Sequence, residues 1–338
     1  METCKKLVTK ASLIVLLMVF TAGCTRKWSE ETGIGFNLVH NKDGMTLGYS
    51  PASGVKILTI NRLAFKDLNR NGKLDPYEDW RLPFDERARN LASLLSVEQI
   101  AGLMLYSSHQ SIPSAGGGRM GGGTYGGKPF AESGANPGDL TDQQKTFLSE
   151  DNVRHVLITT VQSPEVAATW NNNAQSFVEG IGLGIPVNTS SDPRHGSDSY
   201  AEYNAGAGGR ISMWPGTLGI AATFDPSLMR KFGEVASAEY RALGITTALS
   251  PQIDLATEPR WSRFDGTMGE DPQLAADMAR AYVDGFQTSS GSDEISGGWG
   301  YHSVNAMVKH WPGGGPEEGG RDGHYGYGEY AVYPGNNL

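Results

Sequence analysis

Apolar residues recur along the chain in two alternating patterns. One has the period of a helix. It is clearest over 226–243, where Leu228, Phe232 and Val235 fall on one face at successive turns. The other consists of short apolar runs rich in β-branched residues, such as 155–159. The helical spacing predicts further helices over 83–104, 164–180 and 272–287.

The short apolar runs lie between these helices and predict buried strands. They cover 155–159, 185–190, 245–255 and 306–310, and a first buried strand is expected to begin within 103–106. Strands that alternate with helices imply a parallel sheet. About five strands are recognisable. The expected fold is therefore α/β, a (β/α)8 TIM-type barrel that is incomplete in this chain.

The first residues are typical of a targeting signal rather than of the fold. Lys5, Lys6 and Lys10 precede an apolar run over 11–20, which is too short to span a bilayer and ends in small residues before Cys24. This pattern predicts a lipoprotein signal peptide over 1–23 and lipidation of Cys24. The alternative is an ordinary signal peptide that happens to contain a cysteine. We expect a tether and extension over 24–60, and the main domain over 61–338.

Composition narrows the classes of partner. The 338 residues carry a formal charge of −9, which excludes the basic face that a nucleic-acid binder requires. Only two cysteines occur, and Cys4 leaves with the signal while Cys24 would carry lipid. A disulfide or a cysteine-based metal site is therefore not expected in the mature protein. We predict no cofactor for catalysis.

A run over 67–78 has the spacing of a calcium-binding EF-hand loop. Oxygen-bearing side chains fall at the ligand positions, a glycine at position 72 permits the turn, and the residue at 73 can bind only through its carbonyl. The sequence predicts either a lone structural Ca²⁺ site or a turn held by its own hydrogen bonds. The candidate ligands are Asp67, Asn69, Asn71, Lys73, Asp75 and Glu78.

Polar clusters follow the predicted strands, where a barrel places its active site. They read DPRHG at 192–196, EPRWSR at 258–263, GEDP at 269–272 and KHWPG at 309–313. Carboxylates and cations can hydrogen-bond the hydroxyls of a sugar, and an aromatic face can stack on its ring. Each cluster alone is weak evidence because charged loop residues are usually solvated surface. Together they favour a sugar-binding site.

These clusters resemble signature motifs of glycoside hydrolase family 3. The run at 254–263 with GEDP is similar to the family's D-P-R-W-G-R and G-E-D-P, 309–313 to its K-H-F-P-G, and 192–196 to its D-x-x-H-G. Ser262, Met268 and Trp311 depart mildly from the pattern. The resemblance implies a retaining, exo-acting β-glucosidase-like hydrolase. It also implies that the sugar in subsite −1 is bound by Asp192, Arg263, Lys309 and His310.

The resemblance leaves the catalytic groups open. The family's nucleophile is an Asp in an S-D-W or T-D-W motif, and none follows Pro312. We therefore expect a fragment that is inactive alone. The β-N-acetylhexosaminidase branch carries a D-x-H acid/base pair in the loop after K-H-F-P-G, and Asp322 with His324 resembles it. The alternative is that these two residues form only a loop hydrogen bond.

Three readings of function follow. The leading one is hydrolysis of β-linked glucosides or oligosaccharides by a protein that is exported and lipid-anchored to a bacterial membrane, at the periplasm or cell surface. The second is a β-N-acetylhexosaminidase that uses Asp322 and His324. The third is a lipoprotein that binds sugar without cleaving it. The sugar, its linkage and the oligomeric state are not determined by the sequence.

Overall fold

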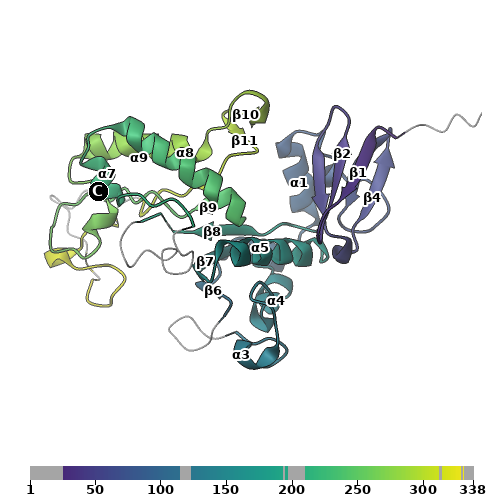
Figure 1. Ribbon diagram of the computed structural model, residues 1–338, viewed down its shortest axis with the longest axis horizontal. Coiled ribbons are helices and arrows are strands. Elements are labelled where there is room, and N and C mark those ends of the chain that lie inside the picture. Colours follow the sequence, from purple (N-terminus) through teal and green to yellow (C-terminus); the bar gives the residue numbers. More distant parts are fainter. Residues whose placement is uncertain are drawn as a thin grey trace, which may run out of the picture.

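The computed structural model describes residues 26–114, 123–192, 195–196, 210–311, 314–328 and 330 (Figure 1). The signal segment and Cys24 lie outside the described residues. Within the described part of the chain, no helix is both long enough and apolar enough to cross a membrane.

A five-stranded parallel sheet forms the centre of the molecule, in the order β12-β9-β8-β7-β6. This confirms the predicted α/β fold with a parallel sheet. Because parallel strands point the same way, their carboxyl ends meet at one edge of the sheet. The strands are β6 (Gln110–Ile112), β7 (His155–Val161), β8 (Asn188–Ser191), β9 (Thr247–Ala248) and β12 (Asn305–Ala306).

Helices connect these strands, and their boundaries follow local signals. Ser163, Asp225 and Asp271 each cap a helix that has proline in its first turn, with the side-chain oxygen accepting from a backbone N–H two or three residues ahead. These caps explain why the predictions for 164–180, 226–243 and 272–287 agree with the structure. The helices are α5 (Pro164–Glu179), α8 (Pro226–Leu243) and α9 (Pro272–Gln287).

The core lies between the sheet and these helices. A cluster of aromatic rings joins α8 to α9, with the rings of Tyr282 and Phe286 stacked at 4.7 Å and Phe232 packed against both. The two helix backbones approach closely at Gly233 and Gly285. A Cβ atom at position 285 would lie 2.9 Å from the Cα atom of Gly233. These two glycines therefore set how tightly α8 and α9 pack.

The predicted helix over 83–104 is two helices. Leu95 ends α1 (Phe84–Leu94), and Ser96 begins α2 (Val97–Leu103) through a capping box with Gln99. A strand was expected to begin within 103–106, and Tyr106 forms an isolated parallel bridge with His155 of β7. Leu103 ends α2, and the edge strand β6 starts only at Gln110. Short helices α3 (Phe130–Ser133), α4 (Asp142–Ser149) and α7 (Thr217–Ala221) complete the connections.

Residues 26–60 are folded rather than a bare tether. They form an antiparallel three-stranded sheet and most of a hairpin, which lie to one side of the parallel sheet (Figure 1). The strands are short and largely exposed, so the sequence shows only weak periodicity there. The elements are β1 (Trp28–Thr32), β2 (Asn37–Asn41), β3 (Thr46–Tyr49), β4 (Lys56–Ile60) and β5 (Leu63–Asp67), followed by the 3-10 turn η2 (Pro76–Glu78). A small hairpin, β10 (Glu294–Ser296) with β11 (Trp299–Gly300), precedes β12.

Candidate functional site

The candidate site begins where the parallel strands end. β8 leads directly into Asp192, and the segment after β12 carries Lys309 and His310. The segment after β9 runs beside them, because Gln252 forms a parallel bridge with Lys309 and the Ile253 N–H donates to the Lys309 carbonyl at 2.7 Å. Polar side chains from three neighbouring strands therefore meet at one edge of the sheet.

Lys309 forms an ion pair with Asp192. The Lys309 Nζ lies 2.5 Å from Asp192 Oδ1. The two side chains are 17% and 30% exposed, so the pair is held by the protein yet open to a ligand from one side. The Tyr240 hydroxyl also donates to the backbone carbonyl of Asp192 at 2.5 Å, which anchors this residue to α8. The pair offers a cation and a carboxylate oxygen within reach of adjacent hydroxyls.

His310 is oriented by a buried carboxylate. Its Nδ1 lies 2.8 Å from Asp254 Oδ2, and the Asp254 side chain is only 2% exposed. The His310 backbone N–H also points to Asp254 Oδ1 at 3.3 Å. Asp254 therefore fixes both the main chain and the ring of His310, so that Nε2 is the nitrogen left to meet a ligand. Asp254 is the first residue of the motif at 254–263, but the sequence alone indicated no role for it. Its position near the carboxyl end of the strand predicted over 245–255 was the available signal.

A second histidine and a second buried carboxylate stand beside the first pair. His324 Nδ1 lies 2.7 Å from Asp322 Oδ1, and the other oxygen of Asp322 accepts from the indole N–H of Trp261 at 2.8 Å. The rings of His310 and His324 meet edge to face at 5.9 Å. The two Asp–His pairs are thus adjacent, although they come from different loops.

Electrostatics keep Asp322 ionised. Burial opposes its charge, but hydrogen bonds from the His324 backbone N–H, the Trp261 indole and the His324 side chain outweigh burial and lower the pKa of this carboxyl. An ionised Asp322 accepts a hydrogen bond from the Nδ1–H group of His324. This arrangement directs His324 Nε2 toward Arg263, in the wall of a cleft, where the nitrogen can take or give a proton.

Arg263 joins this group through several long contacts. Its Nη1 lies 3.3 Å from His324 Nε2, its Nη2 lies 3.4 Å from Gln252 Oε1, and its Nε lies 3.9 Å from Asp322 Oδ2. All four residues predicted to bind sugar therefore belong to one contiguous network, together with the predicted Asp322 and His324 pair. Gln252 was not identified from the sequence, because a lone glutamine carries no pattern.

Glu239, on α8, holds the loop that follows Asp192. One carboxylate oxygen lies 2.7 Å from Nε2 of the buried His195, and the carboxylate also accepts from the Ser212 backbone and hydroxyl. His195 and Ser212 lie on either side of the segment 197–209, which is outside the described residues. Burial lowers the pKa of His195, although the Glu239 carboxylate opposes this effect. The sequence offered no signal for Glu239, since it lies within a helix.

Arg260 and Glu270 belong to the EPRWSR and GEDP motifs beside the site. Arg260 pairs with Glu258, whose carboxylate lies 2.8 Å from its Nη2. Glu270 forms no ion pair with any residue that the structure describes.

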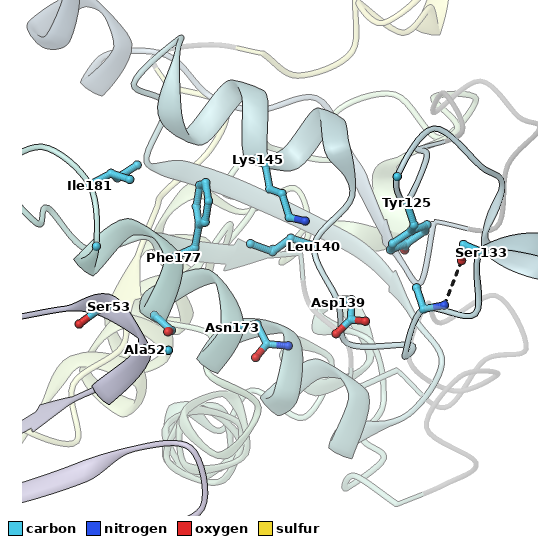
Figure 2. A pocket seen from close by; sticks show the side chains of 14 residues that line it. Ala52, Ser53, Tyr125, Ser133, Asp139, Leu140, Lys145, Asn173, Phe177 and Ile181 are labelled. Carbon is cyan, nitrogen blue, oxygen red and sulfur yellow. Dashed lines mark hydrogen bonds between the residues drawn. The ribbon is translucent and has the colours of Figure 1, made fainter.

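One cleft lies beside this network, and a second, larger cleft lies away from it. A cleft of about 380 Å³ is bounded by Ser262, Arg263, Asp322, His324 and Tyr325 and opens onto the network. A larger cleft of about 670 Å³ lies elsewhere, between α4 and α5 (Figure 2). Figure 2 shows Lys145, Phe177 and Asn173 lining this space. Only the smaller cleft adjoins the residues that can bind a sugar.

The predicted calcium ligands are brought together in the loop between β5 and η2. Asp67 Oδ2 accepts from the Gly72 N–H, and Asp75 Oδ2 accepts from the side-chain amides of both Asn69 and Asn71. Hydrogen bonds thus close the loop. Among the described residues, no group of three or more His, Cys, Asp or Glu side chains is already placed as metal ligands.

Known proteins resemble this chain over most of its length. The chain is 43% identical over 286 residues to a periplasmic beta-glucosidase/beta-xylosidase of Dickeya chrysanthemi, an alignment that covers 84% of this chain and 40% of that protein. It is 36% identical over 276 residues to beta-glucosidase C of Emericella nidulans, covering 80% and 40% of the two. The chain therefore spans about 40% of the length of these relatives.

The fold also has solved counterparts. A β-glucosidase from Erythrobacter marinus superposes with a TM-score of 0.50 at 24% identity, covering 75% of this chain and 28% of that one. Residues 128–333 match the N-terminal domain of glycosyl hydrolase family 3, and this range contains Asp192, Arg263, Lys309 and His310. The chain belongs to glycosyl hydrolase family 3.

Proposed function

We propose that this protein takes part in the hydrolysis of β-linked glucosides, acting from the end of the substrate with retention of configuration. The observation that carries the proposal is the convergence of Asp192, Arg263, Lys309 and His310 at the carboxyl ends of neighbouring parallel strands. Relatives named as β-glucosidases and a β-xylosidase support the class of substrate.

Each residue has a role that its contacts support. Asp192 accepts hydrogen bonds from sugar hydroxyls, while Lys309 donates to a neighbouring hydroxyl and keeps Asp192 oriented. His310, held by Asp254 through Nδ1, offers Nε2 to a hydroxyl near the cleaved bond. Arg263 donates from the opposite side, next to His324. A ring bound in this way is fixed by several directional bonds, which is the positioning that glycoside cleavage requires.

We propose that residues 61–338 form part of a (β/α)8 barrel. Five parallel strands in order, with polar residues at their carboxyl ends, support this arrangement. The attacking carboxylate of a retaining mechanism is not among the residues assigned here. We therefore expect these 338 residues alone to bind sugar without hydrolysing a glycoside.

One experiment separates the readings. Titration calorimetry of the 338-residue protein with glucose and xylose is expected to show binding, and Lys309→Met is expected to abolish it. Hydrolysis of nitrophenyl β-glucoside is expected only from a longer product that supplies the nucleophile. Normal turnover by the 338 residues would show that the nucleophile is already present. Absence of sugar binding in wild type would remove the proposed site.

The geometry also favours a second candidate, a β-N-acetylhexosaminidase. The Asp322 and His324 pair has the contacts of a proton-transfer dyad, with 2.7 Å between Nδ1 and Oδ1 and a lowered pKa for the carboxyl. Rates on nitrophenyl N-acetyl-β-glucosaminide and nitrophenyl β-glucoside discriminate the two activities. A sugar-binding lipoprotein without catalysis would bind these sugars and cleave neither compound in any natural length.

We propose that the protein is exported and anchored by lipid on Cys24. The signal pattern supports export, and so does the relative named as periplasmic. Cys24→Ala is expected to move the protein from the membrane fraction to the soluble fraction. Mass spectrometry of the mature N-terminus checks the lipid directly. An unmodified Cys24 would contradict the lipid anchor and favour an ordinary signal peptide.

A further inference from the structure

The loop between β5 and η2 gathers three carboxylates that have no counter-charge. Asp67 and Glu78 are buried, at 2% and 5% exposed, and Asp75 is half-buried. None of the three forms an ion pair with a described residue, and the nearby Lys73 points to solvent. Buried carboxylates normally pair with a cation or bind a metal, since an uncompensated buried charge is costly.

Hydrogen bonds bind these carboxylates into one cluster. Glu78 accepts from the backbone N–H groups of Leu68, Asn69 and Asp75, and Asn69 in turn donates its side-chain amide to Asp75. One segment of twelve residues therefore contains three acidic side chains, which short hydrogen bonds hold within the same loop. The amide donors satisfy many of the lone pairs but bring no positive charge.

One oxygen in this cluster has no partner at all. Asp67 Oδ1 is buried and accepts no hydrogen bond, while Oδ2 of the same carboxylate accepts from Gly72 in the middle of the loop at 3.0 Å. One oxygen of the Asp67 carboxylate is therefore hydrogen-bonded to the loop, and the other has no hydrogen-bond donor. A ligand that supplies positive charge at this point would satisfy Oδ1 and compensate the neighbouring carboxylates together.

We propose that this loop binds Ca²⁺. The available donors are all oxygens, which suit a hard cation, and their spacing along the chain is that of a loop that accommodates six or seven ligands. Ca²⁺ tolerates such an irregular shell, whereas Mg²⁺ demands near-octahedral geometry and retains its waters. The ligands are the side chains of Asp67, Asn69, Asn71, Asp75 and Glu78, with the Lys73 carbonyl.

Binding requires only a small local change. Asn69 and Asn71 now direct Nδ2 toward Asp75 Oδ2, at 2.7 Å each. A half-turn of each amide exchanges nitrogen for oxygen at Asp75, and the terminal torsion of asparagine has broad, two-fold preferences. The turn gives up the bonds that Asn69 Oδ1 and Asn71 Oδ1 accept from the backbone N–H groups of Asn71 and Lys73, at 3.1 and 2.7 Å. The cation then takes the place of the two amide donors at Asp75.

The site lies where the N-terminal strands join the parallel-sheet part of the chain. Arg70, within the loop, donates from Nη1 to the carbonyl of Gly180 at the end of α5, at 2.6 Å. The loop also leads through η2 into α1. A bound ion therefore stiffens this junction, and its removal is expected to lower the stability of the protein rather than to act at the sugar site.

The test is calorimetric titration of CaCl₂ into chelator-treated protein, with thermal melting in Ca²⁺ and in EDTA. We expect saturable binding of one ion and a higher melting temperature in Ca²⁺. MgCl₂ at the same concentration is expected to give a much smaller shift. No heat and identical melting curves would overturn the proposal, and so would a response to Mg²⁺ that equals the response to Ca²⁺.

Asp67→Asn is the decisive variant, because it keeps the shape and the Gly72 bond while removing one charge. Its affinity for Ca²⁺ should fall roughly 10-fold or more, the range seen when a metal site loses a supporting group. In EDTA it should melt no lower than wild type, which separates loss of a ligand from misfolding. Asp85→Asn, an exposed carboxylate outside the loop, is the matched control and should bind Ca²⁺ normally. Unchanged affinity in Asp67→Asn would overturn the assignment.

Discussion

The ammonium group of Lys309 lies 2.5 Å from the carboxylate of Asp192, although 117 residues separate them in the sequence. The two residues follow β12 and β8, which are the two neighbours of strand β9 in the sheet. The ion pair therefore crosses the carboxyl edge of the sheet over the end of β9. This contact places the cation and the carboxylate of the proposed sugar site side by side.

Removal of the Lys309 ammonium is expected to impair the proposed reaction. Lys309→Met keeps the length of the side chain but leaves Asp192 without its partner and the sugar without a donor. We expect kcat/KM in the catalytically complete protein to fall about 100-fold to 1,000-fold, the range for one lost electrostatic donor. Lys145→Met, in the cleft of Figure 2, is the control and should have no effect. Equal activity of the two variants would contradict the assignment.

The dyad is tested by His324→Ala and Asp322→Asn in the same background. If His324 transfers the proton, its removal should lower kcat about 100-fold to 10,000-fold. Asp322→Asn should also lower kcat, because an amide cannot hold Nδ1 in the same state. The measurement is the pH–rate profile of each variant on nitrophenyl substrates. A profile that keeps the wild-type shape after loss of His324 would leave the pair as a loop hydrogen bond.

Asp322 also predicts a dependence of stability on acid. Its pKa is lowered in the folded protein, so the unfolded chain binds the proton more readily. This contribution to stability is present above the unfolded pKa of about 4 and is lost as the pH falls through the lower folded pKa. Denaturant unfolding at a series of acidic pH values should show a steeper loss for wild type than for Asp322→Asn. Parallel curves would refute this prediction.

Close packing of α8 on α9 predicts a steric effect at Gly285. A Cβ atom there would lie 2.5 Å from the Arg230 carbonyl oxygen, so Gly285→Ala must push the helices apart. We expect a loss of about 1–3 kcal/mol in the free energy of unfolding, as for other overpacked cores. Gly216→Ala is the control, because that position has open space and an ordinary φ of −57°. The comparison is made by denaturant unfolding. Similar stability of both variants would show that the helices can separate without cost.

The sequence by itself determined the elements whose signals are local. Helices α8 and α9 begin and end at the predicted residues because an aspartate cap and a proline start each one. The motif residues could also be identified, because each motif is a short continuous run near the end of a predicted strand. The sequence also located the acidic loop at 67–78 from spacing alone.

The tertiary structure decided what depends on residues far apart in the chain. Asp254 holds His310 from 56 residues away, and Glu239 lies 44 residues from His195. Strand order and register create these pairs, and neither leaves a mark in the local pattern. The break at Ser96 and the folded N-terminal strands were also missed, because short, exposed elements bury too little to impose periodicity. Local chemistry therefore determined which residues are present, and long-range packing determined which of them touch.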